Sequence, residues 1–358
     1  MQLAFYAPLK APNHAVPSGD RAMGRAVIHA LRHIGYDVTL ASSLRTRDGK
    51  GDTQVQQNLI REAAQETTRL IAAGRTAEWR AWITYHNYYK APDLIGPHVA
   101  QALGIPYLQI ETSRARKRLA GPWAEFAQAA EAAADTADVL FYLTERDAET
   151  LRRDAPERQQ LIHLRPFLDR MELPDASTLA GPVLSVGMMR HGDKLSSYQI
   201  IAETLAELPK NAVNLHIAGD GPARTEVEIL MRPFAEKVTF LGALDAEAMA
   251  RAYQTASVLF WPGVNEAFGL TYLEAQAAGI PVTAQNRPGV REILAPGDYP
   301  DPDEGASTLA QHLLSRTTSP QNRQHLGAQA RDHVAAHHLL PAAAETLRQG
   351  LATVGVHL

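Results

Sequence analysis

Short apolar runs alternate with segments of helical periodicity along almost the whole chain, and this alternation restricts the fold more than any other feature. The first series of runs lies at 3–6, 36–40, 81–84, 106–110 and 139–142. The second series lies at 182–187, 213–218, 238–241, 256–261 and 280–284. Strands that alternate with helices pair in parallel and carry helices on both faces of the sheet. The sequence therefore predicts an α/β protein.

A segment without clear periodicity separates the two series of strands. Residues 164–180 contain Pro166 and Pro174 and few regularly spaced apolar residues. A chain of 358 residues is long enough for two domains, each with a core of its own. We therefore predict one α/β domain over residues 1–170 and a second over residues 171–340.

Composition excludes several classes of protein. The net charge of −4 argues against a general nucleic-acid-binding protein. Cysteine is absent, which excludes a disulfide framework and thiolate chemistry. The residues at 1–8 are too short and uncharged for a signal peptide, and no apolar run is as long as a membrane span. We expect a cytoplasmic protein, which could still bind peripherally to the inner face of the membrane.

One predicted strand-to-helix turn carries two carboxylates eight residues apart. The buried run at 256–261 is followed by a loop with Glu266 and by a short helix at 270–278 that carries Glu274. The amides at 268–271 lack partners within the helix and carry the positive end of its dipole, so they form an anion site. A nucleotide sugar fits, with its diphosphate at the helix tip and hydroxyls on both sides. The alternative is an amphipathic helix with a solvated Glu274.

Two other loops of the second series follow predicted strands. Arg190 and Lys194 come after the strand at 182–187, and ligands of open α/β sheets bind beyond the carboxyl ends of strands. A guanidinium and an ammonium suit a diphosphate, although two cations on a solvated loop would have the same sequence. Gly219 follows the strand at 213–218 and lets a ligand approach the backbone, although Gly-Asp-Gly-Pro is also an ordinary turn.

The string EAFGLTYLEAQAAGIPV at 266–282 resembles the donor-site signature of retaining GT-B glycosyltransferases, in particular glycosyltransferase family 4. The resemblance covers most of the chain and is densest from 183 to 292. It implies two Rossmann-like domains that face each other across a cleft, with a final helix at 341–358 that crosses back to the first domain. It further implies a retaining hexosyltransferase that moves a sugar from a UDP- or GDP-linked donor to a glycan or lipid acceptor, with no metal and no cofactor.

The resemblance also assigns roles to single residues. Arg190 and Lys194 match the pair that binds the donor diphosphate, and Glu266 matches a catalytic carboxylate. The implied donor-binding residues are Gly19, Gly219, Leu241, Gly242, Phe268, Gly269, Leu270 and Glu274. The family's paired glycines after the first strand appear here as Ser18 and Gly19. Asp20, which comes next, either caps a helix or contacts the ligand.

The chain departs from the family pattern at the acceptor side. Many relatives have a histidine after the fourth strand, where this chain has Glu111. A different histidine, His86, follows the preceding strand and lies beside two tyrosines in the sequence. Either His86 or Glu111 could orient or deprotonate an acceptor hydroxyl. The alternative for His86 is a hydrogen-bonded loop residue.

A basic cluster follows Glu111 in the sequence. It consists of Arg114, Arg116, Lys117 and Arg118, with Trp123 close behind. Related enzymes that glycosylate membrane acceptors use this part of the first domain to touch anionic lipid. A solvated helix face, or a site for a phosphate on the acceptor, is equally compatible with the cluster.

Three other functions compete with a glycosyltransferase. A GT-B epimerase or a phosphorylase would share the fold, but we find no sequence context for the pyridoxal lysine of a phosphorylase. A non-catalytic nucleotide-sugar-binding protein would not need the complete pairs Glu266 with Glu274 and Arg190 with Lys194. Asp301 and Asp303 lie in a proline-rich loop and are not predicted to bind a metal.

Overall fold

The computed structural model describes residues 1–15 and 19–358, and the chain divides into two compact units. The first unit consists of residues 1–169 and 340–358, and the second of residues 170–339. Residues 164–182 form no helix or strand, as expected of a linker. The boundaries predicted at 170 and 341 each lie one residue from those of the units.

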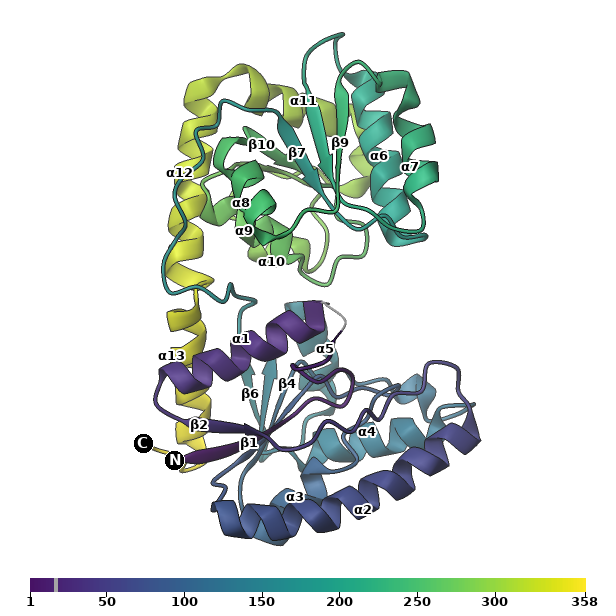
Figure 1. The fold of residues 1–358 in the computed structure, drawn as a ribbon, viewed down its shortest axis with the longest axis vertical. Coiled ribbons are helices and arrows are strands. Elements are labelled where there is room, and N and C mark those ends of the chain that lie inside the picture. Colours follow the sequence, from purple (N-terminus) through teal and green to yellow (C-terminus); the bar gives the residue numbers. More distant parts are fainter. Residues whose placement is uncertain (16–18) are drawn as a thin grey trace. The chain divides into compact units, whose positions relative to one another are not determined.

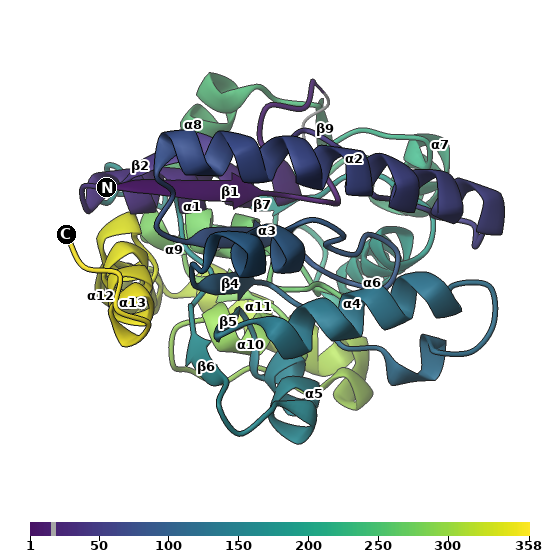
Figure 2. The ribbon, with the colours of Figure 1, turned by 90° about the horizontal axis from the view of Figure 1, so that it is seen from below.

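The first unit is built on a six-stranded parallel sheet in the order β2-β1-β3-β4-β5-β6 (Figure 1). Its strands are β1 (Gln2–Tyr6), β2 (Asp37–Leu40), β3 (Trp82–Tyr85), β4 (Tyr107–Ile110), β5 (Val139–Tyr142) and β6 (Gln160–His163). Its helices are α1 (Gly19–His33), α2 (Thr53–Ala77), α3 (Gly96–Leu103), α4 (Ala124–Thr136), α5 (Glu145–Asp154) and α13 (Leu340–Thr353), with a short 3-10 helix at Arg116–Arg118. Helices α2 and α3 pack side by side, and α1 packs against α13 (Figures 1 and 2).

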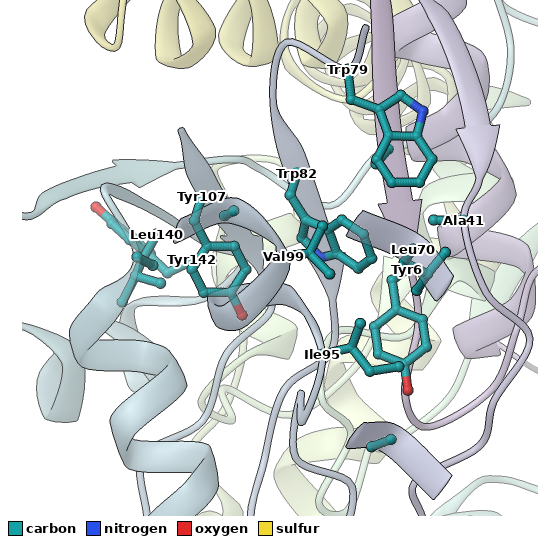
Figure 3. Packing of buried hydrophobic residues seen from close by; sticks show 14 of the residues in the cluster. Tyr6, Ala41, Leu70, Trp79, Trp82, Ile95, Val99, Tyr107, Leu140 and Tyr142 are labelled. Carbon is teal, nitrogen blue, oxygen red and sulfur yellow. The ribbon is translucent and has the colours of Figure 1, made fainter. Parts of the chain in front are cut away.

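Aromatic side chains dominate the core on one face of this sheet (Figure 3). Trp82 of β3 packs between Tyr6 of β1, with ring centres 6.2 Å apart, and Trp79, at 5.8 Å. Leu70 of α2 and Val99 of α3 close the cluster from the helix side. Burying a large apolar side chain stabilises the fold by roughly 1.5–3 kcal/mol, so this face anchors the central strands whose ends carry polar residues.

The second unit repeats the plan with five parallel strands in the order β11-β10-β7-β8-β9. Its strands are β7 (Val183–Val186), β8 (Leu215–Ala218), β9 (Val238–Gly242), β10 (Val258–Phe260) and β11 (Val282–Thr283). Its helices are α6 (Asp193–Glu207), α7 (Arg224–Met231), α8 (Ala246–Thr255), α9 (Leu270–Ala277), α10 (Val290–Ile293), α11 (Gly305–Thr318) and α12 (Pro320–His337), with 3-10 helices at Arg232–Phe234 and Pro302–Glu304. The two parallel sheets with their helices confirm the α/β prediction.

Strand β6 is the one strand that the apolar runs did not predict. It lies at the edge of the first sheet and pairs only with β5. Its residues Gln160 and His163 are polar, and the strand is exposed or half-buried along its length. An edge strand needs no continuous apolar run, because only part of its surface is covered.

Candidate active site

The loops after β7 and β10 lie at the same edge of the second sheet, because these two strands are neighbours in it. Lys194, in the first turn of α6, forms an ion pair with Oε1 of Glu266, in the loop after β10. Trp261 Nε1 donates a hydrogen bond of 2.9 Å to the same oxygen. The Lys194 ammonium also lies 5.4 Å from the centre of the Trp261 ring. The structure thus brings Lys194 and Glu266 together and adds Trp261, which the sequence indicated only as a strand residue.

Two tyrosines hold Trp261 in place. Tyr198 of α6 packs edge-on against its ring with centres 5.1 Å apart, and donates a 2.7 Å hydrogen bond to the carbonyl of Gly187. Tyr272 of α9 donates a 2.9 Å hydrogen bond to the Trp261 carbonyl. The position of the Glu266 carboxylate is therefore set by packed side chains rather than by its loop alone.

The second oxygen of Glu266 is available to a ligand. The Glu266 side chain is 13% exposed and that of Lys194 is 30% exposed, so their ion pair is partly shielded from water. Lys194 and Trp261 both contact Oε1, and Oε2 has no hydrogen-bond partner among the residues described. A carboxylate with one oxygen fixed and the other open can accept a hydrogen bond from a hydroxyl.

Arg190 differs from its predicted partner Lys194. Its guanidinium is exposed in the loop after β7, and it forms no ion pair or side-chain hydrogen bond within the described part of the chain. The two residues predicted to bind the diphosphate therefore differ in whether they are ion-paired. Lys194 already neutralises a carboxylate, whereas Arg190 retains its full charge for an anion.

Helix α9 begins at Leu270, the residue at which the sequence predicts a helix to start. Gly269 precedes its first turn with φ +72°, a backbone conformation that glycine adopts without strain, and Leu270 is the first helical residue. Phe268 therefore lies in the loop just before the helix. The Tyr272 amide already donates a 3.0 Å hydrogen bond to the Gly269 carbonyl, so the amides left at the helix tip are those of Gly269, Leu270 and Thr271.

Glu274 lies within α9 beside a residue that the sequence did not point to. The Tyr253 hydroxyl, from α8, donates a 2.9 Å hydrogen bond to Oε2 of Glu274. Burial raises the pKa of Glu274, and Tyr253 and Arg170 oppose this rise. Glu274 is therefore not the solvated carboxylate of an amphipathic helix. No spacing along the chain links Tyr253 to Glu274, because they come from two different helices.

Backbone packing accounts for the glycine of the Gly-Asp-Gly-Pro turn. A Cβ atom on Gly219 would lie 1.9 Å from the carbonyl oxygen of Gly187. The Gly219 amide donates a 2.8 Å hydrogen bond to the carbonyl of Gly242, at the end of β9, and Leu241 next to it is half-buried. These residues join the ends of three neighbouring strands, and this structural role is sufficient to require a glycine at 219. Their contact with a donor stays a prediction.

In the first unit, three polar side chains meet at the carboxyl ends of strands. His86 directly follows β3 and Glu111 directly follows β4, while Asp20 lies in the first turn of α1. His86 Nδ1 donates a 2.8 Å hydrogen bond to Asp20 Oδ1 and lies 3.7 Å from Glu111 Oε1. The sequence left His86 and Glu111 as alternatives, but the structure brings both together. It also adds Asp20, which contacts His86.

The electrostatics of this group favour a protonated histidine. Burial opposes the charge on His86, but Glu111 and Asp20 outweigh it and raise the pKa of His86. Burial likewise raises the pKa of Glu111, with His86 opposing the rise. His86 and Glu111 have φ of 65° and 58°, a region that non-glycine residues rarely adopt and that is enriched at functional sites.

A buried polar network supports the two strands that carry His86 and Glu111. Asp93 is 2% exposed and accepts hydrogen bonds from the hydroxyls of Thr84 and Tyr107. The amide of Gln109 donates to the Tyr107 hydroxyl at 2.6 Å, and Asn87 donates to Gln109 at 3.3 Å. Buried polar groups whose hydrogen bonds are all satisfied make the surrounding structure rigid. The network therefore fixes the ends of β3 and β4 relative to each other.

Asp20, His86 and Glu111 could also hold a metal ion, since their ligand atoms lie within 4.8 Å of one another. Ligand spacing along the sequence could not indicate this group, because its members come from three separate strand-to-helix connections. The hydrogen bond from His86 to Asp20 equally suits an acid–base pair, in which the carboxylate fixes one ring nitrogen and leaves Nε2 for a substrate.

The structure contradicts part of the predicted basic cluster. The Arg114 side chain is 1% exposed and forms ion pairs of 2.9 Å with Glu131 and 2.7 Å with Asp135. Arg116 pairs with Asp154 at 3.3 Å but remains exposed. Arg114 therefore anchors the loop to α4 and cannot touch a lipid surface. Only Arg116, Lys117 and Arg118 keep accessible charge.

Gly19, predicted to contact the donor, is the first residue of α1, and a Cβ at this position would meet no atom within 4 Å. Open space around Gly19 gives no packing reason for a glycine there. The accompanying prediction at Pro17 and Ser18 lies outside the described residues. Among those that are described, no helix is long and apolar enough to cross a membrane.

Comparison with known proteins bears on both units. Residues 181–315 match the family model described as glycosyl transferases group 1. Alpha-D-kanosaminyltransferase of Streptomyces kanamyceticus is 25% identical over 283 residues, which is 74% of this chain and 72% of that protein. A GDP-mannose-dependent alpha-mannosyltransferase of Mycolicibacterium smegmatis is 32% identical over 134 residues, but the match spans only 37% of this chain and 31% of that protein.

The fold has close counterparts among solved structures. HepE of Anabaena, solved in complex with UDP, superposes with a TM-score of 0.72 at 13% identity and covers 99% of this chain and 100% of its own. At this identity the likeness concerns the fold alone. It confirms the predicted GT-B architecture of two Rossmann-like units.

Proposed function

Because the chain is a glycosyltransferase of the group 1, GT-B type, we propose that it is a retaining, family 4-like hexosyltransferase that uses a nucleotide-diphosphate sugar. The observation that carries the proposal is the arrangement of Lys194, Trp261 and Glu266 in the loops of the second unit, with α9 starting directly after the Glu266 loop. The acceptor is a hydroxyl of a glycan or lipid, and the reaction belongs to glycan or glycolipid biosynthesis.

The second unit would stabilise the leaving diphosphate. Negative charge grows on this group as the bond to the sugar breaks, and a fixed cation or helix tip stabilises that charge without rearranging. Arg190 carries an unpaired guanidinium, Lys194 is partly exposed, and α9 offers its free amides. These groups supply the charge that a metal provides in other enzymes, so we propose that the reaction is metal-independent.

The two carboxylates of the signature would hold the donor on either side of the diphosphate. Oε2 of Glu266 is open to a sugar hydroxyl, and Glu274 would accept hydrogen bonds from the ribose in place of Tyr253. Lys194 and Trp261 bind Oε1 of Glu266, and the open Oε2 is assigned to a sugar hydroxyl rather than to the anomeric carbon. With no residue assigned as a covalent nucleophile, we propose attack by the acceptor on the same face that the diphosphate leaves.

In the first unit, His86 would accept the acceptor's proton. The bond from the anomeric carbon to the phosphate oxygen breaks, a bond to the acceptor oxygen forms, and the hydroxyl proton passes to Nε2 of His86. Nδ1 of His86 is held by Asp20, so Nε2 is the nitrogen left for this step. Asp20 and Glu111 then stabilise the imidazolium that results.

The proposal leaves open the nucleobase of the donor and includes contact with a membrane. The Mycolicibacterium relative is a GDP-mannose-dependent enzyme, and HepE was solved with UDP. The proposal therefore includes both GDP- and UDP-linked donors. Contact with an anionic membrane would involve Arg116, Lys117 and Arg118, with the exposed Leu119 beside them. Co-sedimentation with anionic vesicles at low and high salt tests this contact, because screening shortens the attraction to about 8 Å at physiological salt.

A screen of UDP- and GDP-sugars by thermal shift tests the donor assignment. A ligand at one hundred times its dissociation constant stabilises the folded protein by about 2.7 kcal/mol, which is readily detected. Slow hydrolysis of the stabilising donor identifies an enzyme. Binding without hydrolysis or transfer indicates a nucleotide-sugar-binding protein, and conversion to an epimeric sugar indicates an epimerase. If no nucleotide sugar stabilises the protein, the proposal is wrong.

A further inference from the structure

Next to His86, the first unit presents a continuous row of aromatic rings that the proposed chemistry does not use. The ring centres of His86 and Tyr88 are 5.0 Å apart, those of Tyr88 and Tyr89 are 5.7 Å apart, and those of Tyr89 and Trp123 are 5.8 Å apart. All four side chains are half-buried, so each is partly accessible to solvent. The row leads from the proposed acceptor base, His86, to Trp123, which lies 34 positions after Tyr89 in the sequence.

Two cations lie over these rings instead of pairing with acids. Lys90 Nζ is 5.6 Å from the centre of the Tyr89 ring and 5.2 Å from that of Trp123. The Arg118 guanidinium is 5.1 Å from the Tyr89 ring and 5.6 Å from the Trp123 ring. Neither cation forms an ion pair within the described chain, and Nε of Arg118 is buried without a hydrogen-bond partner. Aromatic faces hold these charges in place without neutralising them.

Several other arginines of the same unit do pair with acids, although some exposed ones, such as Arg75 and Arg80, do not pair with any of the residues that the structure describes. Arg114, Arg116, Arg152, Arg153 and Arg158 all form ion pairs with carboxylates. Arg47 resembles Lys90 and Arg118, because it has no acidic partner and instead contacts the Tyr88 hydroxyl, where it opposes the rise in the pKa of Tyr88 that burial causes. Positive charge is therefore left uncompensated around the aromatic row.

The loops that carry this surface are fixed before any ligand binds. Tyr88 and Ala91 exchange backbone hydrogen bonds of 3.4 Å and 2.9 Å across a tight turn. Trp123 Nε1 donates a 3.3 Å hydrogen bond to the Asp48 carbonyl, and the Asp48 amide donates to the Lys90 carbonyl at 2.9 Å. A preorganised site loses little entropy when it binds a ligand.

We propose that Tyr88, Tyr89 and Trp123, with Arg47, Lys90 and Arg118, form an acceptor subsite for a sugar or polyol ring that carries a phosphate. The rings would cover the apolar face of the acceptor, and the cations would bind its phosphate. This inference rests on the proposed function, because it assigns the acceptor class of the same reaction. The phosphate belongs either to a free sugar phosphate or to the headgroup of a glycolipid.

Calorimetric titration with glucose 6-phosphate tests the subsite, with glucose and inorganic phosphate as comparison ligands. The donor site is blocked with the nucleotide that the donor screen selects, or weakened by Arg190→Gln if none is found. We expect glucose 6-phosphate to bind more tightly than either comparison ligand. The double variant Lys90→Gln/Arg118→Gln should bind it at least about tenfold more weakly, since each charge-assisted hydrogen bond contributes to affinity.

Two further variants separate the roles of charge and ring. Arg75→Gln/Arg80→Gln removes the same charge from exposed positions near the start of β3, at the opposite end of that strand from His86, and should leave the affinity unchanged. Tyr89→Leu should remove the preference for glucose 6-phosphate over inorganic phosphate, whereas Tyr89→Phe should keep it. Equal affinity in the wild type and the Lys90→Gln/Arg118→Gln variant, or an equal loss in the Arg75→Gln/Arg80→Gln control, overturns the proposal.

Vesicles distinguish the source of the phosphate. Binding to phosphatidylglycerol vesicles but not to phosphatidylcholine vesicles, with a loss in Lys90→Gln/Arg118→Gln, identifies a lipid headgroup. Binding of glucose 6-phosphate without vesicle binding identifies a free sugar phosphate. Nucleotide binding by the wild type is measured in parallel. If a nucleotide sugar binds and is hydrolysed while no phosphate ligand depends on Lys90 and Arg118, the subsite is wrong and the glycosyltransferase assignment stands.

Discussion

The two units carry polar sites at the same structural position, beyond the carboxyl ends of parallel strands, but the charge of the two sites is organised in opposite ways. In the second unit, Lys194 neutralises the Glu266 carboxylate, Trp261 donates a hydrogen bond to it, and Arg190 remains as free positive charge. In the first unit, the carboxylates of Asp20 and Glu111 surround the single histidine, His86.

This difference follows from the chemistry that each site can perform. An excess of fixed positive charge stabilises a leaving diphosphate but cannot accept a proton. A histidine between two carboxylates can accept a proton, because the carboxylates stabilise its charged form. The same α/β plan therefore supports two different chemical tasks, which depend on the residues in the loops rather than on the sheets.

The largest expected effect concerns the acid–base site. His86→Gln should lower the turnover of sugar transfer by about 10²–10⁴-fold, the usual contribution of a general base. Donor affinity, measured by titration, should be unchanged, since the residues proposed to bind the donor, apart from Gly19, belong to the second unit. Steady-state transfer assays measure the effect. Wild-type turnover in His86→Gln would remove the proposed difference between the two sites.

Loss of the central cation of the second unit should have the next largest effect. Lys194→Ala removes the positive charge beside the leaving diphosphate and leaves Glu266 without its ion pair. Turnover should therefore fall about 10²–10³-fold, and this loss should exceed the loss in ground-state donor affinity. Lys210→Ala, which removes an exposed lysine just beyond α6, is the matched control. Donor hydrolysis at the wild-type rate in Lys194→Ala would show that Lys194 does not assist the leaving group.

Glu274→Ala should weaken donor binding by roughly 1.5–3 kcal/mol, because the ribose hydroxyls lose a charge-assisted partner. Tyr253→Phe removes only the neutral hydroxyl that contacts Glu274 and should change donor affinity less. Calorimetric titration of both variants measures the difference. Unchanged donor affinity in Glu274→Ala would mean that this carboxylate has a structural role only.

The pH dependence of transfer should report on Asp20. His86 must be neutral to accept a proton, and Glu111 and Asp20 raise its pKa against the effect of burial. Turnover should therefore rise with pH, with a midpoint above the ordinary histidine value of about 6.5. Asp20→Asn removes one negative charge, lowers the pKa of His86 and should move the midpoint to lower pH. An identical midpoint in wild type and Asp20→Asn would exclude this coupling.

The smallest expected effect is that of a chelator. If Arg190, Lys194 and the start of α9 hold the diphosphate, transfer should continue at an unchanged rate in EDTA. Activity that disappears and returns with Mg²⁺ or Mn²⁺ would instead indicate that Asp20, His86 and Glu111 bind a metal, as their geometry permits. The two sites would then no longer divide anion stabilisation and proton transfer between them.

Much of the fold could be predicted from the sequence, because buried parallel strands are short, apolar and regularly separated by helices. Edge strand β6 was not predicted, since the exposed Gln160 and the half-buried His163 leave only two apolar residues between them. Arg114 was misjudged for a related reason. A run of basic residues indicates a solvated patch, and only the fold brings Glu131 and Asp135 to this particular arginine.

The sequence by itself determined the α/β class, the two series of strands and the local string from Glu266 to Glu274, because each depends on neighbours along the chain. Only the tertiary structure decided that Lys194 and Trp261 share one oxygen of Glu266, and that Asp20, His86 and Glu111 form one group. These residues are brought together by the order of strands within each sheet. Strand order depends on packing between distant segments, so no local spacing records it.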